Sequence, residues 1–189
     1  WTKVVMKMVR SGIKSGKDYG AIIMGTEKEF CDIYDVNKRP TGKTVDRAAI
    51  ALNDDEYFLI VSAVLVSADK KILITKRDRK KLWSPGMWEI PGGGVKSGES
   101  SLEAIYREIL EETNINLFGR YYKILQTQKR KTVEGNKYFA DIYCFEISQD
   151  DIENIKGQEG EVSDYRLASI EDIKETAKDN KFLRYEDLK

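Results

Sequence analysis

The chain has 189 residues, and its 32 lysines and arginines balance 32 aspartates and glutamates, so the net charge is zero. This length suits one domain with an extension, and the balanced charge argues against general attraction to nucleic acid or to a membrane. Histidine is absent, which excludes Ser-His and Cys-His nucleophile pairs and any zinc site held by histidine.

The first part of the chain divides into two segments. Residues 1–29 are basic near their start and carry no pattern to which we can assign a role. Residues 30–36 alternate and predict a short strand, 37–42 have turn chemistry, and 46–55 form a polar connector. We therefore expect an N-terminal extension of unknown role over 1–29, a strand and connector over 30–56, and the main domain over 57–189.

The main domain is predicted to begin with a strand that is buried on both faces. Residues 57–66 form a continuous apolar run, typical of such a strand and too short to span a bilayer. Further strands are expected at 71–77, 121–128, 138–147 and 161–167, with loops at 78–85 and 150–160, a Glu-Gly-Asn turn at 134–136 and a Ser-capped helix at 169–178. Cys31 and Cys144 lack metal-ligand spacing, so we expect buried or incidental thiols in a reducing cytoplasm.

Three glycines at 92–94 precede a second predicted helix. We interpret them as a flexible turn that brings backbone groups close to a ligand. Ser100 is a suitable N-cap, and Glu103 stands three residues later, as in a capping box. Leu102, Ile105 and Ile109 recur at helical spacing, and Asn114 tolerates the left-handed conformation that ends a helix.

The predicted helix carries an unusual cluster of carboxylates. At about 100° per residue, Glu108, Glu111 and Glu112 share one face beside the apolar stripe. Like charges at these spacings repel by a few tenths of a kcal/mol per pair, and a bound Mg²⁺ or Mn²⁺ would remove that repulsion. The alternative is a solvated face, because glutamate is a good helix former.

The spacing of these residues resembles a known family signature. Residues 93–115 follow the pattern of the Nudix box, G-x5-E-x7-R-E-U-x-E-E-x-G-U with U aliphatic, and only Asn114 departs from it, where the family has glycine. A second, weaker resemblance is to a Nudix subgroup related to isopentenyl-diphosphate isomerase. The motif at the start of that subgroup's sequences is matched here by Ile33, Asp35, Asn37, Gly42 and Thr44. Mixed strands with two main helices predict an α+β fold, and the resemblance implies an α/β/α sandwich with a mixed sheet.

The resemblance implies metal-dependent hydrolysis of the diphosphate linkage in a nucleoside diphosphate joined to another moiety. It implies Mg²⁺ or Mn²⁺ as cofactor, a small phosphate-containing substrate of the nucleotide-derivative class, and no nucleic acid or membrane partner. A homodimer is compatible with it. The expected metal ligands are Glu108, Glu111, Glu112 and, from a later loop, Glu159, with Glu161 as its neighbour. The expected catalytic residues are Glu111, Arg107 as the group that orients a glutamate, and Glu99. Glu111 is the candidate base within the box, and Glu159 and Glu161 are the alternative candidates in the later loop.

Other residues have both a functional and a structural interpretation. Gly92, Gly93, Lys76 and Arg77 are candidates for contact with substrate phosphates, although the two cations could equally lie at a solvated edge. Arg107 could pair with Glu103 or fold back towards Glu99. Three aromatic residues near the glycines could stack on a base or belong to the core, namely Trp83, Trp88 and Tyr138.

Two competing functions are weighed against hydrolysis. The isomerases use a cysteine in a core loop and a histidine-rich metal site, whereas this chain has no histidine and reads EIPGGG after Trp88. A non-catalytic Nudix domain that senses a nucleotide would be expected to lose box carboxylates, and none is lost here. The sequence therefore favours the hydrolase.

Overall fold

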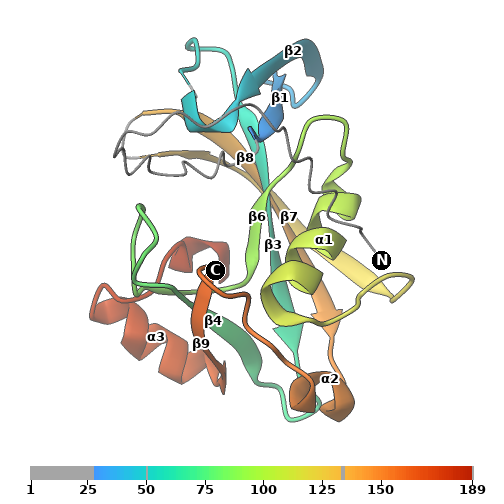
Figure 1. Cartoon of the computed structure of the whole chain (residues 1–189), viewed down its shortest axis with the longest axis vertical. Coiled ribbons are helices and arrows are strands. Elements are labelled where there is room, and N and C mark those ends of the chain that lie inside the picture. The colour runs from blue at the N-terminus through green and yellow to red at the C-terminus, as the bar shows by residue number, and fades with distance from the viewer. Residues whose placement is uncertain (1–27, 50, 133–134, 189) are drawn as a thin grey trace, which may run out of the picture.

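A computed structural model describes residues 28–49, 51–132 and 135–188; the predictions for 1–27 and for part of the 134–136 turn lie outside these ranges. Figure 1 shows the arrangement of the elements. In chain order they are β1 (Phe30–Tyr34), β2 (Pro40–Asp46), the 3-10 helix η1 (Arg47–Ala49), β3 (Phe58–Val66), β4 (Ile72–Arg77), β5 (Trp88–Glu89), β6 (Gly92–Gly94), α1 (Ser101–Thr113), β7 (Tyr122–Lys131), β8 (Lys137–Glu146), α2 (Gln149–Glu153), β9 (Val162–Ala168), α3 (Ile170–Lys178) and the 3-10 helix η2 (Tyr185–Leu188).

The main sheet is mixed, as predicted. Its central order is β5-β4-β3-β8-β7, with β6 paired to β3 and β9 paired to β4. β3 and β8 run parallel along their whole length, from Phe58 opposite Tyr138 to Val66 opposite Glu146, whereas the other pairs in this sheet are antiparallel. Seven of the nine residues of β3 are buried, which explains why this strand is a continuous apolar run.

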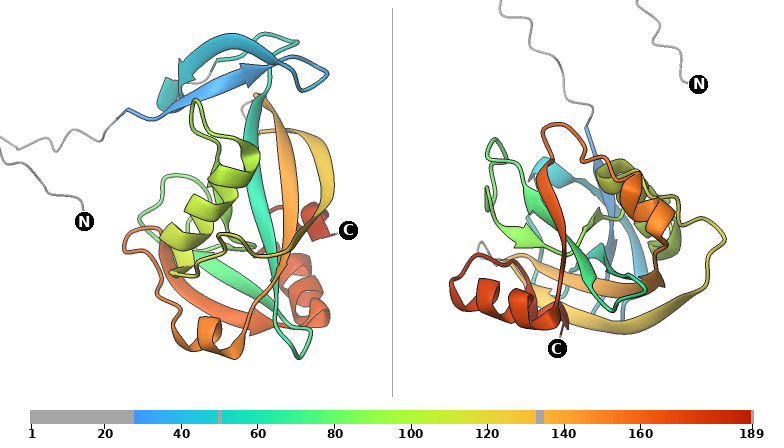
Figure 2. Two further views of the ribbon diagram at one scale, coloured as in Figure 1. Left: turned by 90° about the vertical axis from the view of Figure 1, so that its right-hand side faces the viewer. Right: turned by 90° about the horizontal axis from the view of Figure 1, so that it is seen from below.

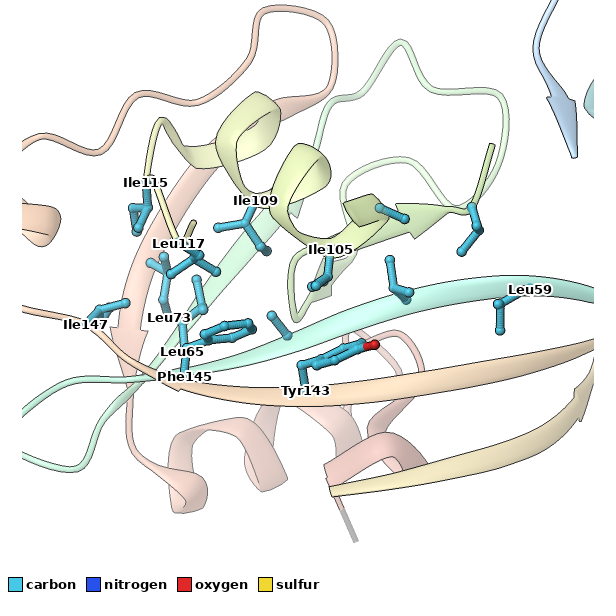
Figure 3. Close-up of a cluster of buried hydrophobic side chains, with 14 of the residues drawn as sticks. Leu59, Leu65, Leu73, Ile105, Ile109, Ile115, Leu117, Tyr143, Phe145 and Ile147 are labelled. Atoms are coloured by element: carbon cyan, nitrogen blue, oxygen red, sulfur yellow. The ribbon is translucent and has the colours of Figure 1, made fainter. Parts of the chain in front are cut away.

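Helices cover both faces of the sheet, so the predicted α/β/α arrangement is confirmed (Figure 2). On one face, Ile105 and Ile109 of α1 pack against Leu65 and Phe145 of the central strands (Figure 3). On the other face, Ile173 of α3 joins a second apolar cluster with side chains of β3, β4 and β8. Successive residues of a strand point to opposite faces, so one apolar run supplies both clusters.

The two main helices begin and end where the sequence predicts. The Ser100 hydroxyl accepts the Glu103 N–H, and the Glu103 carboxylate accepts the Ser100 N–H, which completes the capping box of α1. Asn114 adopts the left-handed conformation with φ of 64°, and its N–H donates to the Leu110 carbonyl. Ser169 and Asp172 form the corresponding box of α3.

Three local predictions are wrong. Residues 92–94 form strand β6 rather than a turn, because Gly92 lies so close to β3 that a Cβ there would be 2.2 Å from the Val61 carbonyl oxygen. Residues 40–46 form β2, which pairs with β1 although it is largely exposed, whereas the sequence predicts a turn through residue 42 and a connector from residue 46. The predicted loop at 150–160 contains the short helix α2, capped by Ser148.

The β1–β2 hairpin lies at one end of the main sheet (Figures 1 and 2) and is attached to it by polar contacts. Tyr34 exchanges backbone hydrogen bonds with Tyr57 just before β3. Lys38 in the hairpin turn donates to both carboxylate oxygens of the buried Asp141 on β8, at 2.5 and 2.6 Å. The hairpin therefore holds a fixed position beside the start of α1.

Two further sequence expectations concern the thiols and the membrane. Cys31 and Cys144 are both free thiols. Among the described residues, none of the helices combines the length and the apolar character that crossing a bilayer would require.

Candidate active site

A cleft of about 910 Å³ opens beside α1. Its walls come from β6, the α1 carboxylates, the loop after β4, the loop before β9 and the C-terminal segment, and they bring together residues far apart in the sequence. Among the predicted site residues, the cleft is lined by Glu108, Glu111, Glu112, Arg107, Gly92, Gly93, Arg77 and Glu161.

Glu108 lies against the backbone of β6. It is only 9% exposed, and a Cβ placed on Gly93 would lie 2.4–2.5 Å from its carboxylate atoms. Position 93 is therefore a glycine because the carboxylate occupies the space of a side chain. Burial raises the pKa of Glu108, while the positive charges of Arg107 and Arg47 oppose that rise.

Glu112 lies one helical turn further along the same face. Its carboxylate accepts the N–H of Gly92 at 3.1 Å. Burial, together with the negative charges of Glu89 and Glu108, raises its pKa to about 8. Glu111 is the exposed member of the trio, with its side chain 41% accessible. The two more buried carboxylates are therefore crowded by like charge, which a bound cation would relieve.

Arg107 connects the box residues to one another. Its Nε and Nη2 donate to the two oxygens of Glu99 at 2.6 and 2.8 Å, and Nη2 also donates to the Gly94 carbonyl at 2.9 Å. Its Nη1 donates to Glu108 at 2.8 Å and to Glu111 at 3.3 Å. Of the two partners considered from sequence, Arg107 thus takes Glu99, because Glu103 is occupied in the capping box. Although burial alone would lower the pKa of Arg107, its carboxylate partners raise it.

Sequence reasoning missed Glu89 at the end of β5. This carboxylate is 3% exposed and accepts Arg77 Nη1 at 2.8 Å and Arg184 Nη2 at 3.0 Å. Its negative charge acts on Glu112. The two arginines lie 12 and 95 positions away in the sequence, so only the fold brings them to it. The one local signal was a charged residue between the apolar Trp88 and Ile90.

The cations and the loop glutamates differ from the predicted arrangement. Arg77 lines the cleft, but its guanidinium holds Glu89, while Lys76 lies over the Trp88 ring and does not line the cleft. Glu161 lines the cleft and forms an ion pair with Lys81. Glu159 is exposed and lies outside the cleft lining.

Of the three aromatic candidates for base stacking, one lines the cleft and two do not. Trp83 lines the cleft and its ring lies 5.1 Å from the Arg77 guanidinium. Lys76 and Arg166 both lie over the Trp88 ring, at 5.4 and 4.7 Å from its centroid, and the Tyr138 ring packs against Phe58 with centroids 5.3 Å apart. Only Trp83 is therefore placed to meet a ligand in the cleft.

The chemistry of the donors fits a hard divalent cation. The box supplies carboxylate oxygens, which Mg²⁺ and Mn²⁺ prefer, and Glu108 and Glu112 are crowded by other carboxylates. Within the described ranges, no three acidic, cysteine or histidine side chains are already gathered as a ligand set. Arg107 instead bonds both Glu108 and Glu111 in this arrangement.

Comparison with known proteins gives concordant results. The family model described as "NUDIX domain" matches residues 56–185. An RNA pyrophosphohydrolase of Pelagibacter ubique is 31% identical over 142 residues, which cover 68% of this chain and 87% of the relative. An uncharacterized Nudix hydrolase of Listeria monocytogenes is 26% identical over 158 residues, covering 83% and 89% of the two chains. The crystal structure of DR0079 from Deinococcus radiodurans has the same fold, with a TM-score of 0.66 at 19% identity, covering 81% of this chain and 91% of that one.

Proposed function

Because this chain belongs to the Nudix family and is one of its pyrophosphohydrolases, we propose that it hydrolyses the diphosphate linkage of a nucleoside diphosphate derivative with the help of Mg²⁺ or Mn²⁺. One observation carries the proposal most strongly. Two largely buried glutamates, Glu108 and Glu112, lie beside glycine backbone in a cleft, where they repel each other unless a cation or a proton intervenes.

Each box residue has a proposed role. Glu108, Glu111 and Glu112 would hold the cation, which when bound neutralises phosphate charge and activates water. Arg107 orients Glu108 and Glu111 through Nη1 while Glu99 fixes its other nitrogens, so it is a positioning residue. Glu111, the most accessible of the three, is the proposed base. Glu159 remains a predicted ligand, and it would have to enter the cleft from an exposed loop.

The substrate is proposed by class alone. Trp83 offers a ring for a base at the cleft, and Lys80 and Lys81 place positive charge beside it. Because one relative is an RNA pyrophosphohydrolase, the 5′ end of an RNA is a second candidate. Zero net charge argues against general attraction to nucleic acid, and recognition of one terminal nucleotide does not require such attraction.

The two competing functions receive less support. The comparisons identify the Nudix family and do not identify the isomerase-related subgroup, so the resemblance at Ile33 to Thr44 stays a prediction. A domain that only senses nucleotides would not need the complete set of box carboxylates.

The test is a panel of phosphoanhydrides incubated with the protein and Mg²⁺, with release of nucleotide or phosphate as the readout. The panel contains nucleotide sugars, dinucleoside polyphosphates, NAD-type dinucleotides, nucleoside triphosphates and a short 5′-triphosphorylated RNA. Turnover should disappear with a chelator and return with Mg²⁺. Glu112→Gln should lower turnover by at least about 10²-fold, since it removes a proposed ligand. Turnover that survives the chelator, or an inert panel, would contradict the proposal.

A further inference from the structure

The N-terminal hairpin contacts the turn that precedes α1. Asp32 of β1 accepts the Ser97 hydroxyl at 2.6 Å and the Gly98 N–H at 2.9 Å, and the Ser97 N–H donates to the Phe30 carbonyl at 2.8 Å. This turn leads directly to Glu99, the partner of Arg107. The hairpin therefore supports the box, although it lies outside residues 56–185 that the family model matches.

Arg47 extends from the end of this hairpin into the cleft. It follows β2, lines the same cleft as the box carboxylates, and keeps 38% of its side chain accessible. Its backbone N–H donates to the Glu29 carbonyl and its Nη1 pairs with the Glu29 carboxylate, both at 2.8 Å. One part of the guanidinium is thus fixed while the rest of the side chain faces the cleft.

Arg47 and Glu108 approach β6 from different sides. A Cβ on Gly94 would lie 2.4 Å from the Arg47 guanidinium carbon, just as a Cβ on Gly93 would meet the Glu108 carboxylate. Neighbouring residues of a strand point to opposite faces, so the two charged groups flank the strand. The bare backbone of β6 allows both groups to come close to a ligand that passes over it.

A substrate diphosphate carries negative charge on both phosphates. The metal site on α1 would neutralise the phosphate next to it, and the other phosphate then needs a donor from elsewhere. A guanidinium is suited to this task because its donors match the oxygens of a phosphate. All three arginines hold a carboxylate, but Arg77 and Arg107 keep only 15% and 19% of their side chains accessible. Arg47 holds Glu29 through Nη1 alone and keeps 38% of its side chain accessible.

Building on the proposed function, we propose that Arg47 binds non-bridging oxygens of the substrate diphosphate, on the phosphate remote from the α1 carboxylates. The N-terminal hairpin is then a wall of the active site that supplies a substrate-binding cation. A purely structural role, in which Arg47 serves only to pair with Glu29, makes a different prediction. Removing either residue would then break the same ion pair and should weaken binding equally.

The test measures binding of methylenediphosphonate, a hydrolysis-resistant diphosphate, to the full chain with Mg²⁺ by isothermal titration calorimetry. Arg47→Ala should weaken binding roughly tenfold or more, the effect of losing a charged hydrogen bond, and Arg47→Lys should recover part of the loss. Glu29→Gln breaks the same ion pair but keeps the guanidinium, so it should bind at least as tightly as the wild type. Lys43→Ala removes another cation of the hairpin, one that pairs with Glu56, and should change nothing.

Wild-type affinity in Arg47→Ala would overturn the proposal, and so would equal losses in Arg47→Ala and Glu29→Gln, or a wild type that does not bind the probe. If Arg47→Ala fails to fold, Gly94→Ala displaces the guanidinium without deleting it and should show the same loss. With any hydrolysed substrate, Arg47→Ala should raise KM more than it lowers kcat. An inert substrate panel with intact probe binding would refute the hydrolase and leave the role of Arg47 standing.

Discussion

Replacing Gly93 by alanine tests the metal site with a single methyl group. The new Cβ would lie 2.4–2.5 Å from the Glu108 carboxylate, whereas ordinary contacts begin at 3.4 Å, so the carboxylate must retreat by about 1 Å. A misplacement of this size in a catalytic group costs roughly 10²-fold in rate. The fold itself should tolerate the change, because the obstructing atoms end a side chain and alanine restricts the unfolded chain more than glycine does.

The assay is turnover as a function of Mg²⁺ concentration, with thermal unfolding measured on the same samples. Gly93→Ala should lower kcat by roughly 10²-fold and require more Mg²⁺, with a melting temperature close to that of the wild type. Gly94→Ala is the matched variant, since its Cβ meets Arg47 instead, and it should keep the Mg²⁺ dependence of the wild type. A Gly93→Ala protein with normal rate and normal Mg²⁺ dependence would show that the position of Glu108 does not matter.

Three further predictions concern stability. Arg120 holds the pKa of Asp151 down to about 2, below its ordinary 3.8, so this pair stabilises the fold above pH 4 and loses that effect as the pH falls towards 2. Arg120→Met should therefore cost about 1–2 kcal/mol in urea unfolding at pH 6, roughly half as much at pH 3 and little at pH 2; a constant difference would contradict this. Asn114→Ala places alanine, which disfavours the left-handed conformation, at a position with φ of 64°. It should cost about 1 kcal/mol in the same assay, whereas Asn114→Gly should be closer to wild type. Arg184→Ala leaves the buried Glu89 with Arg77 alone and should cost about 1–3 kcal/mol, so an unchanged midpoint would argue against their contact.

Local signals predicted both main helices, including α1, which carries the site. Ser100 and Glu103 are close in sequence, and so are Ser169 and Asp172, so their capping boxes can be recognised without the fold. The same signal exists at Ser148 and could have revealed α2. Its five residues are too few to show helical periodicity, which explains why the segment resembled a loop.

The features that could not be predicted from the sequence are those that depend on contacts between segments far apart in the chain. The glycines of β6 carry no side-chain pattern, and they form a strand only because β3 offers its backbone at close range. Glu89 belongs to the site through two arginines supplied by other segments. Arg47 likewise reaches the cleft through the placement of the hairpin, which depends on Lys38 and on contacts with Ser97.

The parallel pairing of β3 with β8 sets a condition on how the chain folds. Val61 faces Asp141 across this pair, and the two residues are about 80 positions apart in the chain. The middle of the sheet therefore forms only when this long loop closes. Such distant closure slows folding relative to neighbouring hairpins. During synthesis, β3 and β4 must therefore leave the ribosome well before their central neighbour exists, and their apolar surface stays uncovered for that interval.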